Sequence, residues 1–181
     1  MMIPGDGSVR HHIQGAFGWT ICNEQQGLQV AAGMDPAYGS KPTSYCAEAY
    51  GMLSLLRFLI RIAEYTSMHF PWIGIIATDC QTLLDTLNGV DELEQNYDTP
   101  LNIDGGNVVL LDVLIPDWDV LIEIQRSLDQ LPRIKLAYVK GHQGRDAPYA
   151  QLNQMAQLNV DADAKLGSVR TSLEQSGPSP S

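Results

Sequence analysis

The strongest constraint on the fold is an apolar run, Ile73-Gly74-Ile75-Ile76-Ala77-Thr78, that ends at an acidic residue, Asp79. Pro71 precedes the run, and its composition predicts a buried strand over residues 72–78. Chemistry in α/β proteins gathers at the carboxyl ends of such strands, near a switch in strand order. Asp79 is therefore a candidate functional residue on position alone.

The neighbouring segments place this strand in a mixed sheet. The expected elements are strands at 6–9, 15–23 and 28–32, a helix capped by Thr43 or Ser44 with apolar positions to Ile62, the strand at 72–78, a helix at 81–87, an irregular acidic insertion at 90–112, a helix at 116–131, a strand at 134–139 and a helix at 152–166. An antiparallel meander joined to a strand–helix–strand crossover predicts an α/β fold, with a mixed five-stranded central sheet flanked by helices. We expect one domain over residues 1–168 and a disordered Ser/Pro/Gly-rich tail over 169–181.

The charge balance restricts the partners of the chain. Among 181 residues only 11 are Lys or Arg, and the formal net charge is −10. Phosphate contacts need basic side chains, so this composition argues against a free-standing nucleic-acid binder. It suits a domain that collects divalent cations, or one whose substrate affinity comes from a neighbouring domain.

Cysteine usage and hydropathy bear on the cellular setting. The three cysteines have no C-x-x-C spacing, which indicates neither a disulfide framework nor a structural zinc site. The N-terminus lacks a signal-peptide pattern, and Arg57 and Arg61 interrupt the longest apolar stretch. We expect an intracellular protein, in cytoplasm or nucleus, without a membrane segment.

Four acidic residues far apart in sequence lie where a fold could bring them together: Asp6, Glu48, Asp79 and Asp163. Taken singly, they have ordinary explanations as a turn residue, a partner of a helix dipole, a helix cap and a surface charge. Taken together, clustered carboxylates repel one another unless a cation lies among them. A pair of divalent metal ions is the usual solution.

Two further residues adjust this set. Asp161 and Asp163 point about 200° apart on a helix, so they cannot face one site together. Asn159 is four residues from Asp163 and shares its face, which favours Asp163. His142 lies between Gly141 and Gly144 on an expected mobile loop. A lone loop histidine is usually solvated surface, but this one could also carry a proton or help product to leave.

The chain resembles the ribonuclease H family, in particular the ribonuclease H domains of retroelement reverse transcriptases, from Asp6 to about Leu166. The segments that carry the resemblance are Asp6-Gly7-Ser8, Gly15-Ala16-Phe17-Gly18-Trp19, Tyr45-Cys46-Ala47-Glu48-Ala49, Ala77-Thr78-Asp79, Tyr138-Val139-Lys140-Gly141-His142-Gln143 and Gln157-Leu158-Asn159-Val160-Asp161-Ala162-Asp163. The last two are the most specific. The resemblance implies a ribonuclease H-like fold.

The resemblance also implies a site and a reaction. Asp6, Glu48, Asp79 and Asp163 would bind two Mg²⁺ or Mn²⁺ ions, and His142 would assist turnover. The substrate would be the RNA strand of an RNA–DNA hybrid, read through its 2′-hydroxyls and cut to leave 3′-hydroxyl and 5′-phosphate ends. A reverse transcriptase domain in the same polyprotein is the expected partner.

The sequence departs from the family pattern at three places. Cys80 stands where the family commonly has Ser, and the acidic insertion at 90–112 occupies a region where relatives carry a basic, substrate-gripping element. Only Met1 to Gly5 precede Asp6, which leaves open whether the first strand is truncated. Two alternatives therefore stay open: another nuclease or transposase of the wider superfamily, and a degenerate, non-catalytic domain that serves as a structural or partner-binding module.

Overall fold

A computed structural model describes residues 2–10, 14–23, 28–37, 43–66, 74–96, 117–145 and 147–175, with side chains described from Gly15 onward except at 89–96 and 165–175. Along the chain the elements are β1 (Met2–Arg10), β2 (Gln14–Asn23), β3 (Leu28–Ala37), α1 (Ser44–Thr66), β4 (Gly74–Thr78), α2 (Gln81–Asn96), α4 (Trp118–Asp129), β5 (Ile134–Tyr138), the 3-10 turns η1 (Gln143–Arg145) and η2 (Tyr149–Gln151), and α5 (Gln154–Gln175).

The five strands form one sheet in the order β3-β2-β1-β4-β5. β1 pairs antiparallel with β2 and parallel with β4, and β4 pairs parallel with β5. The switch from antiparallel to parallel pairing therefore falls on β1, in the centre of the sheet. The connections that carry α1 and α4 are the crossovers that parallel neighbours require.

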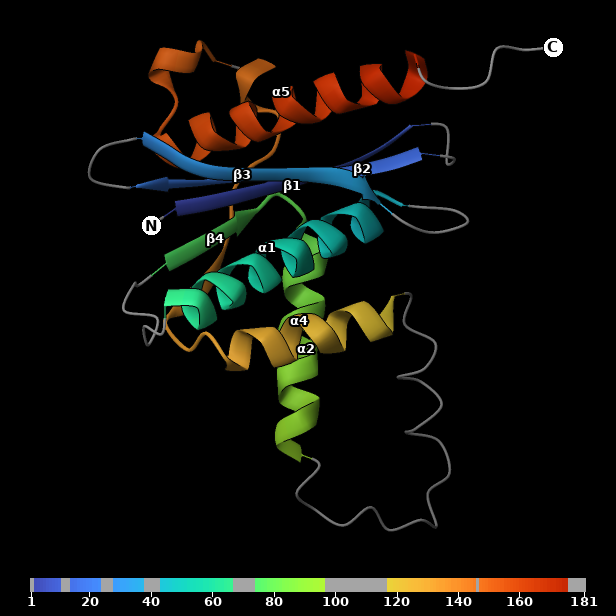
Figure 1. Ribbon diagram of the computed structural model, residues 1–181, viewed down its shortest axis with the longest axis vertical. Coiled ribbons are helices and arrows are strands. Elements are labelled where there is room, and N and C mark those ends of the chain that lie inside the picture. Colours follow the sequence, from blue (N-terminus) through green and yellow to red (C-terminus); the bar gives the residue numbers. More distant parts are fainter. Residues whose placement is uncertain are drawn as a thin grey trace, which may run out of the picture.

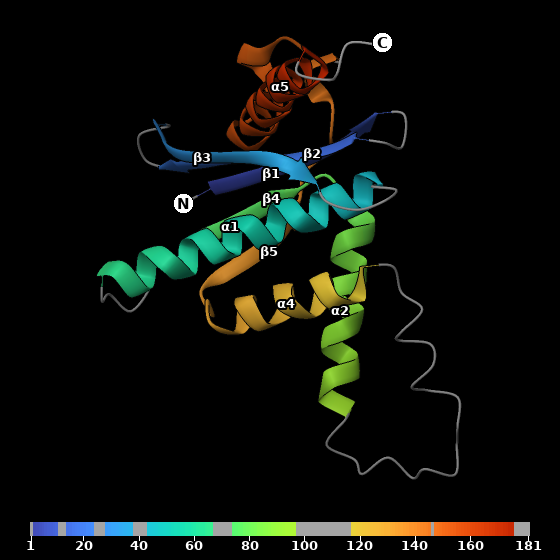
Figure 2. The same ribbon diagram turned by 45° about the vertical axis from the view of Figure 1, so that its right-hand side comes forward.

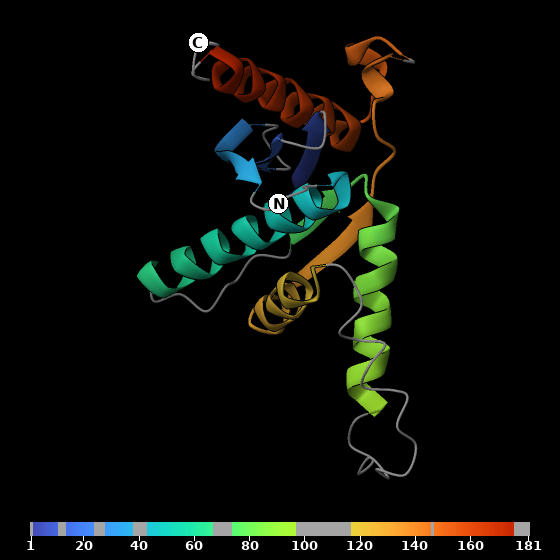
Figure 3. The ribbon, with the colours of Figure 1, turned by 90° about the vertical axis from the view of Figure 1, so that its right-hand side faces the viewer.

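Helices cover both faces of this sheet, which confirms the predicted α/β class. α5 lies along one face, while α1 crosses the other, with α4 packed beneath α1 (Figures 1 and 3). α1 begins where Thr43 Oγ1 accepts a 3.0 Å hydrogen bond from the Cys46 N–H, so Thr43 is its cap. Its core-facing aliphatic side chains follow the predicted helical spacing, and they are Met52, Leu53, Leu55, Leu56 and Leu59.

Aromatic packing joins α1 to β2. The rings of Trp19 and Phe58 have centroids 4.9 Å apart, and Trp19 Nε1 donates a 3.3 Å hydrogen bond to Ser54 Oγ. Opposite Trp19 on β3 stands Gly33, where any side chain would overlap the indole ring. The Trp19 ring thus fills the space between helix and sheet, and it fits because residue 33 has no side chain.

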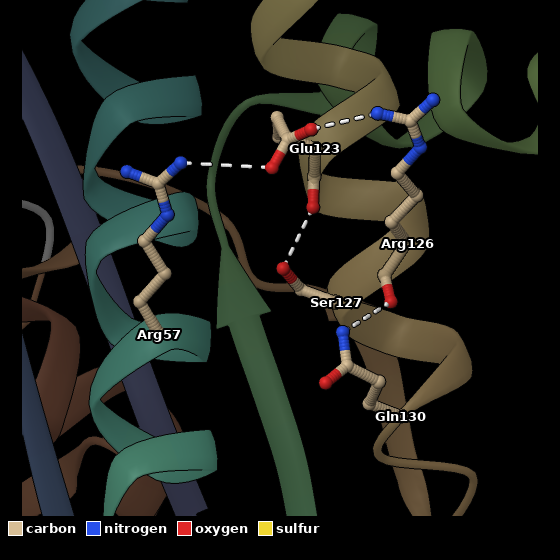
Figure 4. Close-up of polar contacts among 5 residues, drawn as sticks. All are labelled: Arg57, Glu123, Arg126, Ser127 and Gln130. Carbon is tan, nitrogen blue, oxygen red and sulfur yellow. Dashed lines mark hydrogen bonds and ion pairs between the residues drawn. The ribbon is translucent and has the colours of Figure 1, made fainter.

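Polar contacts join α1 to α4 at the surface. Glu123 Oε1 forms an ion pair with Arg126 Nη1 of the same helix at 2.9 Å. Its Oε2 lies 3.6 Å from Arg57 Nη2 on α1 (Figure 4). Ser127 Oγ donates to the Glu123 carbonyl at 2.7 Å, and Gln130 Nε2 donates to the Arg126 carbonyl at 3.1 Å. Arg57, Glu123 and Arg126 border an open groove of about 420 Å³ between the two helices. Exposed pairs of this kind contribute little stability each.

Several predicted boundaries were wrong. β1 runs from Met2 to Arg10 rather than over 6–9. α2 was expected to stop before Asn88-Gly89 but continues to Asn96, because one glycine costs a helix only about 1 kcal/mol relative to alanine. α5 runs to Gln175, so residues 169–175 of the predicted disordered tail are helical.

Residues 97–112 of the predicted insertion lie outside the described part of the chain, as do 176–181. Within the described residues, no helix combines the length and the apolar character needed to cross a bilayer. In Figure 2, the C-terminal end of α2 extends away from the sheet and past α4.

Candidate active site

The site is built around the end of β4. In the parallel ladder, Gly5 of β1 is the register partner of Thr78, the last residue of β4. Asp6 and Asp79 are the next residues on their chains, so their backbones are neighbours at the point where the two strands part. Asp6 also pairs with Gly18 of β2. The sheet thus places the backbones of two of the four predicted acids side by side at the end of the β1–β4 pairing, where antiparallel pairing changes to parallel pairing. The side chain of Asp6 lies outside the described part.

Glu48, in the second turn of α1, comes to the same place from one face of the sheet. It is buried, with 5% of its surface exposed, which is rare for a glutamate without partners. Thr78 Oγ1 donates a 2.9 Å hydrogen bond to Glu48 Oε2. The Glu48 carboxyl group also lies within hydrogen-bonding reach of the Asp79 carboxyl, so two acidic groups meet at the end of β4.

Asp79 carries the electrostatic cost of this arrangement. Burial raises the pKa of its carboxyl above the ordinary value, because the charged form loses hydration. Nearby His142 and the hydrogen bonds from Asn159 and Glu48 act in the opposite direction but do not cancel the effect of burial. A carboxyl with a pKa shifted by burial beside specific polar partners is typical of a functional site.

Asn159 of α5 reaches Asp79 from the opposite face of the sheet. It is buried, with 3% of its surface exposed, and its amide hydrogen-bonds the Asp79 carboxylate. Among the residues that the structure describes, none hydrogen-bonds its Oδ1. A buried acceptor left open costs free energy, and a ligand or water commonly satisfies it at a functional site.

His142 and Asp163 form the outer part of the site. His142 Nδ1 lies 3.6 Å from Asp163 Oδ2, with side chains 58% and 42% exposed. His142 has φ 53°, in the left-handed region, which a residue with a Cβ adopts at a cost. Its turn is closed by hydrogen bonds from Arg145 N to the His142 carbonyl and from Gln143 Nε2 to the Lys140 carbonyl, at 3.1 and 2.7 Å.

Asp161, the competitor of Asp163, faces elsewhere. Its Oδ2 accepts a 3.0 Å hydrogen bond from the Tyr149 hydroxyl, which ties η2 to α5. The structure thus separates the two aspartates, as their spacing on a helix requires.

Comparison with known proteins rests on structure. No protein-family model matches the sequence, and no curated protein matches it significantly. The N-terminal RNase H domain of Rv2228c from Mycobacterium tuberculosis matches with a TM-score of 0.58 over 97% of this chain and 96% of that chain, at 15% identity. LC11-RNase H1 in complex with an RNA/DNA hybrid matches with 0.57 over 95% and 98%, at 14% identity. The chain has the ribonuclease H fold.

A match to a larger protein agrees with this fold. The prototype foamy virus protease–reverse transcriptase gives a TM-score of 0.65 at 14% identity over 92% of this chain, which spans 20% of the viral chain. The predicted ribonuclease H resemblance is therefore confirmed at the level of structure.

The donor chemistry of the candidate site suits divalent cations. The candidate ligands are carboxylate oxygens, which Mg²⁺ and Mn²⁺ prefer. Among the side chains that the structure describes, no three acidic, histidine or cysteine residues form a metal-binding group by themselves. Glu48 and Asp79 lie close together, and among the described residues Asn159 Oδ1 has no hydrogen-bond partner. These features fit a cation held with the help of Asp6.

Sequence reasoning missed two contributors to this candidate site, Thr78 and Gly141, and gave a third, Asn159, only an indirect role. Thr78 was placed on the strand, but its bond to Glu48 crosses between elements and leaves no sequence pattern. Gly141 was taken as a loop residue, yet a Cβ there would stand 3.0 Å from Asp79 Cγ. From sequence, Asn159 served only to favour Asp163, and its amide hydrogen-bonds the Asp79 carboxyl in the same site. The Gly-His spacing was the one signal that could have raised Gly141.

Proposed function

We propose that this chain is a ribonuclease H-type nuclease that hydrolyses the RNA strand of RNA–DNA hybrids with two bound Mg²⁺ or Mn²⁺ ions. The observation that carries the proposal is the adjacency of Asp6 and Asp79 beyond the Gly5–Thr78 register pair, with Glu48 buried against Asp79. The proposed ligands are Asp6, Glu48, Asp79 and Asp163. His142 is the proposed assisting residue.

The chemistry divides between the ions and the chain. When bound, the two ions supply a nucleophilic water at neutral pH and stabilise charge on the phosphate and the leaving oxygen. Glu48 and Asp79 are held by hydrogen bonds from Thr78 and Asn159, so their carboxylates need little rearrangement. His142 can hold a proton at Nδ1, 3.6 Å from Asp163 Oδ2, and pass it on as product leaves.

The substrate and partners are proposed by analogy. LC11-RNase H1 was solved with an RNA/DNA hybrid, and the foamy virus match is a protease–reverse transcriptase. We propose a hybrid substrate and a reverse transcriptase domain in the same polyprotein, at an intracellular location. A neighbouring domain would also supply the basic contacts that a chain with net charge −10 lacks.

Cleavage of an end-labelled hybrid tests the proposal. The purified chain with Mg²⁺ or Mn²⁺ should release RNA fragments with 5′-phosphates, and EDTA should stop the reaction. Asp79→Asn, Glu48→Gln and Asp163→Asn should each lower kcat by roughly 100-fold or more. Asp161→Asn is the matched control, because Asp161 lies on the same helix but bonds Tyr149. Cleavage that survives both EDTA and Asp79→Asn contradicts the proposal.

The net charge of −10 favours a second candidate, a non-catalytic ribonuclease H-like domain that binds a partner protein. A hybrid would bind such a domain weakly, and no divalent ion would change its melting temperature. Fusion to a basic hybrid-binding domain separates the two candidates. The fused chain cleaves if affinity alone was missing, and stays inactive if the site is degenerate.

A further inference from the structure

We propose that Thr78 is a positioning residue, whose hydroxyl fixes the orientation of the Glu48 carboxylate in the site. The proposal rests on the proposed metal-dependent function, since it assigns Thr78 a role toward a proposed ligand. Its support is a chain of hydrogen bonds that joins the backbone, the Thr78 hydroxyl and the buried carboxylate.

The hydroxyl of Thr78 has a defined direction. Its oxygen accepts the Cys80 N–H at 3.2 Å, and its single proton is donated to Glu48 Oε2 at 2.9 Å. A hydroxyl has one hydrogen to give, so these two bonds use its donor and orient its acceptor. Because the carboxylate is planar, a fixed Oε2 also restricts where Oε1 can lie.

Thr78, on β4, is held by the two neighbouring strands. It is in register with Gly5 of β1 and with Tyr138 of β5, and its carbonyl accepts a 3.0 Å hydrogen bond from Val139 N. Only 1% of its surface is exposed. The hydroxyl therefore stands on a buried backbone that is paired on both sides, and its hydrogen bond links that backbone to a side chain of another element, α1.

The ordinary explanation for this residue is packing, since β-branched residues suit buried strands. Packing requires the shape of the side chain but not its oxygen. Valine has nearly the same shape and lacks the hydroxyl, so Thr78→Val separates the two roles. The variant leaves Glu48 Oε2 and the Cys80 N–H without their partner, while serine keeps the hydroxyl.

The test measures Mn²⁺ affinity by calorimetry, cleavage of a labelled hybrid and thermal stability in the full chain. We expect Thr78→Val to weaken Mn²⁺ binding or kcat by roughly 10- to 100-fold, the usual effect of removing a partner of a metal ligand. KM for the hybrid should stay near its wild-type value. Thr78→Ser should restore most of both. Thr20→Val is the matched control, because Thr20 is an equally buried strand residue, 1% exposed, on β2.

A double mutant sharpens the result. In a Glu48→Gln background, Thr78→Val should add little further loss of Mn²⁺ affinity, because its effect passes through the Glu48 carboxylate. A Thr78→Val chain that melts lower yet binds Mn²⁺ and cleaves like wild type overturns the positioning role and leaves the proposed function intact. A wild-type chain that neither binds Mn²⁺ nor cleaves overturns both. If the wild-type chain binds Mn²⁺ without cleaving, the Mn²⁺ affinities of wild type and Thr78→Val decide whether Thr78 has the positioning role.

Discussion

Gly141 and Asp79 are in contact across the site: a Cβ added to Gly141 would stand 3.0 Å from Cγ of the Asp79 carboxyl, and nearer still to Oδ2. The loop after β5 therefore approaches the end of β4 closely because residue 141 has no side chain. The absence of a side chain at Gly141 leaves room for the carboxylate as it stands.

This contact predicts that Gly141→Ala displaces the Asp79 carboxylate. A misplacement of about 1 Å can cost roughly 100-fold in rate, so kcat should fall by about that factor. Gly144→Ala is the control, since its Cβ would meet Val160 Cγ2 at 3.1 Å, a tight but less severe contact without a carboxylate. Steady-state cleavage and melting curves of both variants check the prediction. Equal losses of activity would show that loop crowding, and not Asp79, is responsible.

The ionised carboxyl of Asp79 should lower the free energy of unfolding at neutral pH. Its folded-state pKa lies above the unfolded value of 3.8, so the folded chain binds its proton more tightly between the two. Stability from this group is present below pH 3.8 and is lost as pH rises through the folded pKa. Asp79→Asn should therefore raise the metal-free Tm at pH 7, because the amide carries no charge to desolvate.

The pH dependence supplies the control for that variant. The difference in Tm between Asp79→Asn and wild type should shrink as the pH is lowered toward 4, because wild-type Asp79 then takes up its proton. A difference that stays constant with pH would point to a packing effect of the amide.

Divalent ions should reverse the order of stability. A ligand that binds only the folded state stabilises it by about 2.7 kcal/mol at 100 times its Kd. Mg²⁺ should thus raise the wild-type Tm and leave Asp79→Asn nearly unchanged, and EDTA should restore the metal-free values. Differential scanning calorimetry against Mg²⁺ concentration measures this. A Tm that rises equally in both chains would place the ions elsewhere.

Two substitutions at His142 should separate the effect of its backbone strain on stability from the effect of its imidazole on catalysis. Its φ of 53° is one that glycine adopts freely and alanine at roughly 1–2 kcal/mol. His142→Gly and His142→Ala both remove the imidazole, so their kcat values should fall together, by roughly 10- to 100-fold. His142→Gly should nevertheless melt higher than His142→Ala. Burst kinetics tell whether product release is the slowed step, and unequal kcat values would refute a role that depends on the imidazole alone.

The sequence predicted the parts of the fold that periodicity encodes. Apolar spacing located α1 and the strand before Asp79, and the order of the elements led to the mixed sheet. Helix ends were less predictable, because Gly89 weakens α2 without ending it. Helical spacing also separated Asp161 from Asp163 in advance, since that relation is local.

Contacts between distant elements could not be predicted in this way. The bond from Thr78 to Glu48 and the amide of Asn159 on Asp79 depend on how α1 and α5 sit against the sheet. The register that makes Asp6 a neighbour of Asp79 depends on strand pairing, which no local pattern specifies. The family resemblance identified Asp6 and Asp79 as candidates, and the β1–β4 pairing showed that they are neighbours.

The ladder between β1 and β4 also bears on when the site forms. Gly5 meets Thr78 across about seventy residues of chain, whereas β1 and β2 are joined by a short connection. Loop-closure entropy makes such long-range pairing slow, so the hairpin should form well before β4 docks beside it. The backbones at Asp6 and Asp79 should therefore come together only late in folding. Any electrostatic cost of placing these two acidic residues side by side is thereby deferred to the nearly native chain.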